Sequence, residues 1–230
     1  MLIRRLHLRT SLGLVLLALF LLHAAGTLRF EALDALERTA YDLRLAATAP
    51  GGVDDRIVIA DIDEYSLEQI GHWPWKRHVL AELMDTLFDH YQVKVVGFDV
   101  IFSEADGGSS LPLLQELARG PLRGNAAFQA EVKRQAPLLD YDARFADSLA
   151  GRDVVLGFVF SGQQPLARNP LPDTLFELDP QLAQALPLIR PQGHVAALPS
   201  LQEKAALSGF FDNPRVDNDG IFRRVPLFQL

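Results

Sequence analysis

The chain has 230 residues, of which 49% are hydrophobic, and a formal net charge of −7. Its first 29 residues contain four arginines and no acid, so the rest carries −11, which argues against nucleic acid and anionic lipid as partners. There is no cysteine, which excludes disulfides, cysteine-based zinc sites and thiol catalysis. The length suits a short N-terminal segment followed by one domain or two small ones.

Residues 1–29 have the pattern of a targeting segment. Three arginines precede residues 12–22, which have no polar side chain, and this order places the N-terminus in the cytoplasm. A cleaved signal peptide could end at the small residues 24–26, whereas residues 8–28 have the length of a transmembrane helix. We favour the uncleaved anchor, and in either case the chain after Arg29 faces outward.

Residues 30–50 predict a helix next to the membrane, ended by Pro50-Gly51-Gly52. Its apolar positions recur at three- and four-residue steps: Leu33, Leu36, Ala40, Leu43 and Ala47. Such a helix could simply pack on the following domain, or it could pair with a second subunit, and the pattern fits both.

Residues 51–230 predict an α/β domain with a mainly parallel βαβαβ sheet, flanking helices and a C-terminal β-hairpin. The first two predicted strands, 57–60 and 93–102, are apolar runs rich in β-branched residues. Between them one helical stripe is formed by Leu80, Leu83, Met84, Leu87 and Phe88. A helix over 141–150, capped by Asp140, then leads to a third buried strand over 154–160.

The remaining elements are shorter. Residues 63–71 predict a helix with Asp63 as its N-cap. Further short helices are expected over 111–117, 125–135, 181–186 and 200–207, within irregular proline-rich connections. The final hairpin pairs 210–211 with 221–225, and the chain stops inside a strand-like segment, as expected for the front part of a longer protein.

Polar side chains gather at one predicted edge of the sheet. Asp61 and Glu104 come after strands, Asp99 lies late in a strand, and Arg77 occupies the first turn of the crossover helix on its buried stripe. A cation there opposes the helix dipole, so Arg77 is predicted to bridge Asp99 and Asp61. The carboxyl edge of a parallel sheet is also where ligands bind.

Neighbouring residues extend this candidate site. Two tryptophans adjoin the polar edge, and the alternation of a strand lets only one arginine of Arg223-Arg224 reach a pocket. Helix capping is the alternative role for Asp63, and packing is the alternative for both tryptophans. The candidate ligand-binding residues are Asp61, Asp63, Trp73, Trp75, Arg77, Asp99, Glu104 and Arg223.

Two blocks of the chain resemble the second type of CHASE domain, the cyclase/histidine-kinase-associated sensory extracellular domain. The first block comprises Asp61-Ile62-Asp63, Ser66-Leu67, Gly71 through Arg77 and Gly97 through Glu104, and the second comprises Gly209-Phe210-Phe211, Asp217 through Gly220 and Arg223 through Leu227. Lys76 departs from the family pattern, which usually has proline there, and residues 107–137 lie outside the resemblance.

The resemblance implies a sensor rather than an enzyme. It implies a periplasmic domain on the bacterial inner membrane, held by a single N-terminal anchor and continuing into a cytoplasmic cyclase or kinase. The expected partners are an unknown small-molecule or protein signal, the membrane through residues 8–28, and a second copy in a homodimer. No cofactor and no metal are expected.

Two other functions have partial support in the sequence. Asp61-Ile62-Asp63 after an apolar strand is similar to the magnesium-dependent phosphatases of the haloacid-dehalogenase type, but Tyr65 stands where that family has Thr or Val. A calcium loop at 217–220 fails because Arg215 and Pro226 occupy ligand positions of such a loop.

Overall fold

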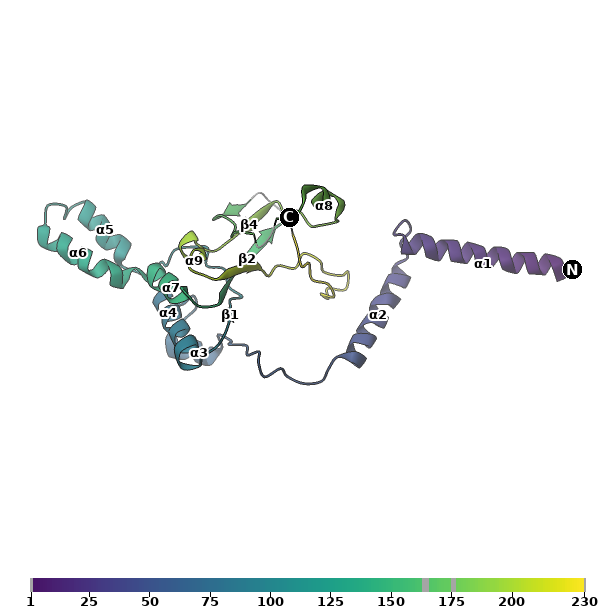
Figure 1. Ribbon diagram of the computed structural model, residues 1–230, viewed down its shortest axis with the longest axis horizontal. Coiled ribbons are helices and arrows are strands. Elements are labelled where there is room, and N and C mark those ends of the chain that lie inside the picture. Colours follow the sequence, from purple (N-terminus) through teal and green to yellow (C-terminus); the bar gives the residue numbers. More distant parts are fainter. Residues whose placement is uncertain (1, 163–165, 175–176, 230) are drawn as a thin grey trace. The chain divides into compact units, whose positions relative to one another are not determined.

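The computed structural model describes residues 2–162, 166–174 and 177–229, with side chains from residue 10 onward, and Figure 1 shows its elements. The chain divides into two compact units, Met1–Asp61 and Ile62–Leu230. We describe each unit by itself.

The first unit begins with helix α1 (Leu2–Ala24). In the part of the chain that the structure describes, no helix combines the length and apolar character needed to cross a bilayer. The expected transmembrane helix over 8–28 is therefore not found. Its uninterrupted apolar run, 12–22, lies between Arg9 and His23 and is shorter than the about 20 mostly apolar residues that a span needs.

Helix α2 (Glu31–Thr48) matches the helix predicted near the N-terminus, and none of its residues is buried. Leu36 and Leu43 of its apolar stripe are 65% and 67% exposed. At its start, His23 Nε2 lies 3.5 Å from Asp34 Oδ1. Leu36 and Leu43 thus lie open to solvent within the described part of this unit.

The predicted first strand, 57–60, is not a strand in the structure. These residues form no ladder, and Val58 and Ile59 are 85% and 90% exposed. β-branched composition favours an extended chain, but a strand also needs a neighbour to pair its backbone groups, and local sequence does not specify that neighbour.

The second unit contains a mostly parallel sheet. Strand β2 (Val154–Ser161) pairs in parallel with β1 (Val96–Gly97) and β5 (Leu207–Phe210), and antiparallel with β4 (Gly193–Val195), which pairs in parallel with β3 (Ala167–Arg168). The predicted strand over 154–160 is confirmed, whereas only two residues of the predicted 93–102 strand join a ladder. A Cβ at Gly157 would lie 2.7 Å from the backbone oxygen of Phe98, so β2 needs glycine there.

Three helices beside this sheet agree with the sequence patterns. Helix α3 (Glu64–Ile70) is capped by Asp63, and α7 (Tyr141–Leu149) by Asp140. Helix α4 (Arg77–Asp85) continues as the π-helical turn η1 (Thr86–His90), and its predicted stripe buries Leu80 and Met84. Helix α7 packs against both α4 and α9 (Pro199–Gln202).

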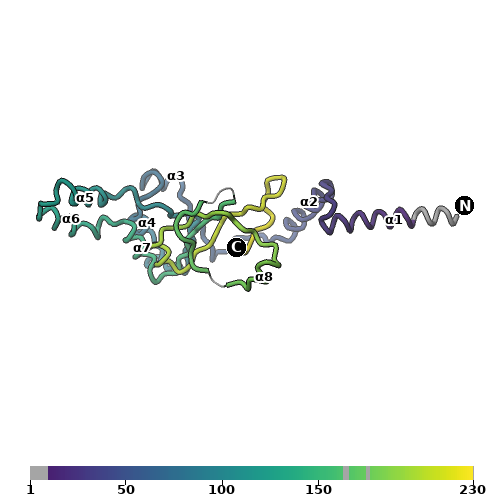
Figure 2. The backbone as a smooth tube through the Cα atoms, turned by 90° about the horizontal axis from the view of Figure 1, so that it is seen from above, coloured from purple at the N-terminus to yellow at the C-terminus, as the bar shows by residue number. Residues whose placement is uncertain are grey.

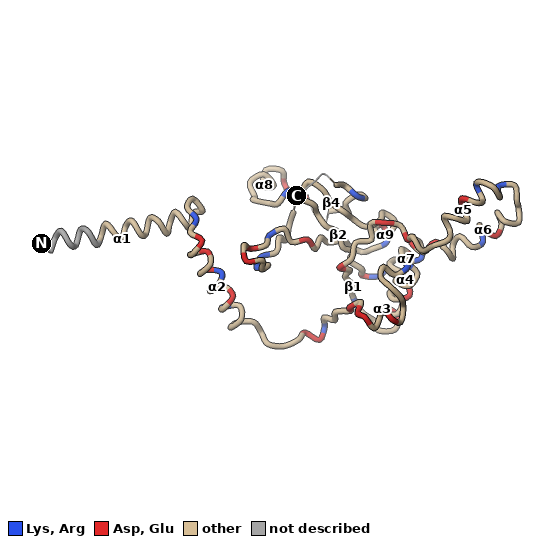
Figure 3. Tube along the Cα trace, turned by 180° about the vertical axis from the view of Figure 1, so that it is seen from behind, with Lys and Arg blue, Asp and Glu red and all other residues tan. Residues whose placement is uncertain are grey.

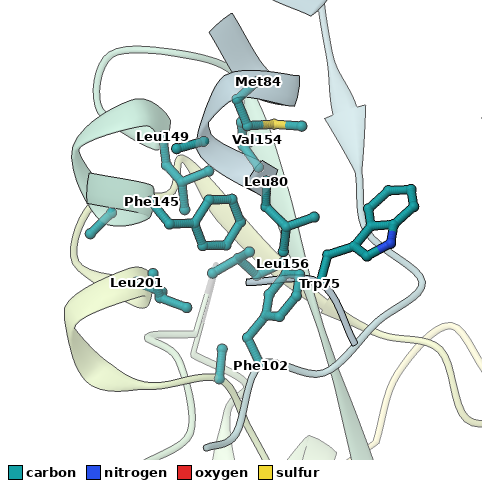
Figure 4. Close-up of a cluster of buried hydrophobic side chains, with 12 residues drawn as sticks. Trp75, Leu80, Met84, Phe102, Phe145, Leu149, Val154, Leu156 and Leu201 are labelled. Atoms are coloured by element: carbon teal, nitrogen blue, oxygen red, sulfur yellow. The ribbon is translucent and has the colours of Figure 1, made fainter. Parts of the chain in front are cut away.

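The core of the second unit lies between these helices and β2 (Figure 4). Phe102 and Phe145 are 1% and 0% exposed, and their rings meet edge to face with centroids 5.2 Å apart. Phe98 contacts both rings at 5.1 and 5.9 Å. This aromatic cluster lies next to the candidate site because Phe102 immediately precedes the polar loop 103–110.

Helices α5 (Leu111–Arg119) and α6 (Ala126–Leu139) form a hairpin that extends away from the sheet (Figures 1 and 2). The two helices pack mainly on each other, and Gln129 Nε2 donates to the Ala118 carbonyl over 2.6 Å. At the base of the hairpin, Ser109 Oγ donates to the Leu139 carbonyl. Figure 3 shows basic residues toward the far end of this hairpin.

The C-terminal segment departs from the predicted hairpin. Residues 207–210 form β5 at the side of β2, whereas 221–225 form no strand. Residues 217–220 make a turn in which Gly220 has φ +81°, and Ile189 pairs with Gln229 in an isolated parallel bridge. The backbone of β5 is hydrogen-bonded to β2, so residues 207–210 are paired without a hairpin. One further helix, α8 (Pro180–Ala185), precedes β4.

Candidate functional site

The candidate site centres on Arg77, the first residue of α4. The residue is only 9% exposed, and burial lowers the pKa of its guanidinium from the ordinary value, while the carboxylates of Asp142 and Asp106 oppose that shift. The dipole of α4 also opposes a cation at this end of the helix. The guanidinium remains charged, because the ordinary pKa of arginine lies far above neutrality.

Asp106 and Asp142 supply the negative charge around Arg77. Arg77 Nε lies 3.4 Å from Asp142 Oδ1 in an ion pair without hydrogen-bond geometry, and the Arg77 backbone N–H donates to Asp106 Oδ2. Arg77 Nη2 donates to the backbone carbonyl of Glu104 over 3.2 Å. The backbone N–H of Asp106 donates to Asp142 Oδ2 over 2.9 Å. We call Arg77, Glu104, Asp106 and Asp142 the Arg77 latch.

Phe102 forms the floor beneath the guanidinium. The Cζ atom of Arg77 lies 4.4 Å from the centroid of the Phe102 ring, within the range of a cation–π interaction. The latch therefore couples a buried cation to the aromatic cluster of the core.

Glu104 contributes to the latch through its backbone, not through the carboxylate that was predicted to bind. Its side chain pairs instead with Arg168 on β3, with Oε1 2.7 Å from Nη1, in an exposed contact. Asn169 Nδ2 donates to the Ser103 carbonyl over 3.0 Å and to the Ala196 carbonyl over 2.9 Å. The loop after Phe102 is thus fixed on two sides, by α4 and α7 and by the β3–β4 region.

The two tryptophans differ in environment. Trp75 is 9% exposed, belongs to the core and donates through Nε1 to the Gly71 carbonyl over 2.7 Å. Trp73 is 37% exposed, and its ring meets that of Trp75 edge to face at 5.8 Å. Packing accounts for Trp75, and Trp73 is the ring that solvent can reach.

Asp61 and Asp63 fall in different units of the structure. Asp61 is the exposed last residue of the first unit, whereas Asp63 caps α3 and accepts hydrogen bonds from the Ser66 backbone N–H and from Ser66 Oγ at 2.8 and 2.7 Å. These bonds lower the pKa of Asp63. The described residues contain no group of three or more acidic or histidine side chains placed for a metal.

Asp99 and Arg223 are also outside the latch. Asp99 is exposed, so the predicted ion pair between Asp99 and Arg77 is wrong. Arg223 pairs locally with Asp217 and Asp219, its Nη atoms lying 2.8 Å from a carboxylate oxygen of each. The pairing of Asp99 with Arg77 was inferred from the edge of a predicted strand over 93–102. Only two residues of that strand form a ladder, so that edge does not determine which acid meets Arg77.

Sequence reasoning missed the two acids that do meet Arg77, although both carry a signal. Asp106 lies in the Gly-rich loop directly after the second apolar run, and Asp142 lies in the first turn of α7. An acid in the first turn of a helix is usually explained by its favourable interaction with the helix dipole. That local explanation of Asp142 gives no indication of its contact with the distant Arg77.

The charged groups of the Arg77 latch contact one another, so the latch is not an open binding surface. Its cation is buried and already contacts a carboxylate, a carbonyl and an aromatic ring. It holds together three segments, α4, loop 103–110 and α7.

Comparison with known proteins agrees with the architecture. A family model described as the CHASE2 domain matches residues 14–230, nearly the whole chain. No curated protein and no solved structure gives a significant match. The match includes the Trp-Pro-Trp-Lys-Arg motif that places Arg77 in the latch, and the resemblance stated from sequence is thereby confirmed. The chain belongs to the CHASE2 family of extracellular sensory domains of signalling receptors.

Proposed function

We propose that the chain is the extracytoplasmic sensory module of a bacterial transmembrane receptor, joined in the same protein to a cyclase or kinase domain. The family match over residues 14–230 carries this proposal. The basic residues before the apolar run 12–22 support export of the segment after that run. The module itself performs no catalysis in this proposal, and its task is to change state when a signal binds.

Export gives the first test. Alkaline phosphatase fused after Leu230 is expected to be active in a bacterial host, because that enzyme folds only where its disulfides can form. The same fusion without residues 1–29 serves as the control and should be inactive. Equal activity of both fusions, or inactivity of both, would contradict an exported module. The reading frame beyond codon 230 tests the receptor itself, because a stop codon there would rule out an attached output domain.

We further infer that the module forms a homodimer through α2. Leu36 and Leu43 are seven residues apart on one stripe, and both are about two-thirds exposed at 65% and 67%. Exposed leucines at heptad spacing are typical of helices that pair. Pairing next to the membrane would let two copies pass a change of state to their output domains.

Replacing both leucines with glutamate should dissociate this dimer. The variant Leu36→Glu, Leu43→Glu is expected to weaken self-association by roughly 100-fold, because two charges would be buried at the seam. Leu45→Glu is a matched control, since Leu45 is 54% exposed and lies off the stripe. Sedimentation equilibrium of the full chain measures the effect. A monomeric wild type at about 100 μM, or equal weakening by Leu45→Glu, would sink the proposal.

A further inference from the structure

A cavity of about 310 Å³ in the second unit lies between segments that are far apart in sequence. Residues 187–189 line one side, residues 224–228 line another, and Arg215 completes the lining. The bridge between Ile189 and Gln229 holds the first two segments together. The volume is at the lower end of the range for small-molecule sites.

The walls of this cavity are mostly apolar. Val225, Leu227 and Phe228 are 68%, 77% and 53% exposed. Burying such side chains under an apolar ligand is favourable, and clustered exposed apolar side chains mark binding surfaces.

Two arginines bring positive charge to these apolar walls. Within the described residues, the guanidiniums of Arg215 and Arg224 have no hydrogen-bond or ion-pair partner. By contrast, Arg168 and Arg223 of the same unit pair with carboxylates at 2.7 and 2.8 Å. Two arginines without an acidic partner among the described residues line one cavity, on a chain of net charge −7, and so offer local positive charge for an anion.

Asn213 fixes the backbone at both arginines. Asn213 Nδ2 donates to the Arg224 carbonyl over 2.8 Å, and the Arg215 backbone N–H donates to Asn213 Oδ1 over 3.1 Å. The neighbouring Asp212 accepts from the Phe160 backbone N–H over 2.8 Å through Oδ1 and from Gln229 Nε2 over 3.2 Å through Oδ2. The cavity is thus anchored to β2 through a hydrogen-bonded scaffold.

We propose that this cavity binds a small organic anion with a carboxylate head and an apolar body. The planar guanidinium groups suit a carboxylate, with which arginine forms paired charge-assisted hydrogen bonds, and the walls suit the apolar body. The proposal deepens the proposed sensory function, on which it rests, by naming the class of signal. It also moves the signal site away from the Arg77 latch, whose cation is already engaged.

Titration calorimetry of the full chain with 3-phenylpropionate tests the proposal. A saturable dissociation constant on the order of 1 mM is expected for a ligand of this size. The neutral analogue 3-phenylpropionamide should bind at least about tenfold more weakly, because it lacks the charge. Inorganic phosphate should not compete at equal concentration, because it has no apolar body.

Variants locate the binding in the cavity. Arg215→Gln, Arg224→Gln should weaken 3-phenylpropionate binding at least about tenfold, whereas Arg123→Gln, a variant in the turn between α5 and α6, should leave it unchanged. Leu227→Glu should abolish binding by repelling the anion. Leu227 is 77% exposed, so this variant is expected to fold. It therefore tests whether the anion binds in the cavity even if the double variant does not fold.

Four results would each overturn the proposal. They are no saturable binding up to about 10 mM, equal binding of the amide, equal competition by phosphate, and binding by Leu227→Glu at wild-type strength. The measurement uses neither export nor an output domain. It can therefore fail while the alkaline phosphatase fusion is active, and it can succeed when that fusion is inactive.

Discussion

Replacing Arg77 with alanine should lower the free energy of unfolding by about 3 kcal/mol. The variant leaves the Asp142 carboxylate, whose side chain is 21% exposed, without its cation, and removes the donor to the Glu104 carbonyl. It also removes the cation over the Phe102 ring. For a domain of this size the melting temperature should fall by roughly 10 °C, and urea unfolding followed by circular dichroism gives the free energy.

A second substitution tests which carboxylate is the partner. Adding Asp142→Asn to Arg77→Ala removes the unpaired charge and should restore about 1 kcal/mol of the lost stability. Adding Asp99→Asn removes the same charge from an exposed site and should restore nothing. The latch would be refuted if Arg77→Ala unfolded at the wild-type urea concentration, or if Asp99→Asn rescued as well as Asp142→Asn.

Replacing Phe102 with alanine should cost about 4 kcal/mol. The side chain is 1% exposed and touches the rings of Phe98 and Phe145, so its removal leaves a cavity in the centre of the core. Phe102→Leu keeps most of the volume and should cost about 1.5 kcal/mol. Phe222→Ala is the control, because Phe222 is 58% exposed and its loss should cost less than about 0.5 kcal/mol.

The same variant can show that Phe102 and Arg77 act together. Because the two side chains share a cation–π contact, the double variant should lose about 1 kcal/mol less than the sum of the single losses. Strict additivity would mean that the Arg77 latch and the core are energetically separate, and a small loss for Phe102→Ala would contradict its central place in the core.

Elements defined by local sequence were predicted well. Helices α3, α4 and α7 are explained by caps at Asp63 and Asp140 and by the apolar stripe of α4, and each of these signals lies within a few residues of the element. Strand β2 is explained by a continuous apolar run. Such signals report backbone hydrogen bonding and burial of one helix face, which the local sequence largely determines.

Pairing between distant segments was predicted poorly. The strand over 57–60 and the C-terminal hairpin were expected from composition, yet neither forms in the structure. Arg77 was correctly expected to be buried beside carboxylates, but its partners are Asp142 and Asp106 rather than Asp99. Which acid reaches a buried cation depends on how α7 docks on α4, and no spacing along the chain reports that.

The hairpin of α5 and α6 has a mechanical consequence for the latch. The chain enters the hairpin just after Asp106 and leaves it just before Asp142, and these two residues are joined by the hydrogen bond between the Asp106 N–H and Asp142 Oδ2. The hairpin is therefore a long arm whose two ends are joined to each other by that bond. A partner that pulls on the far end of the hairpin would load the Ser109–Leu139 hydrogen bond at its base first. The Asp106–Asp142 contact would follow, and through it the cation that holds α4 to α7.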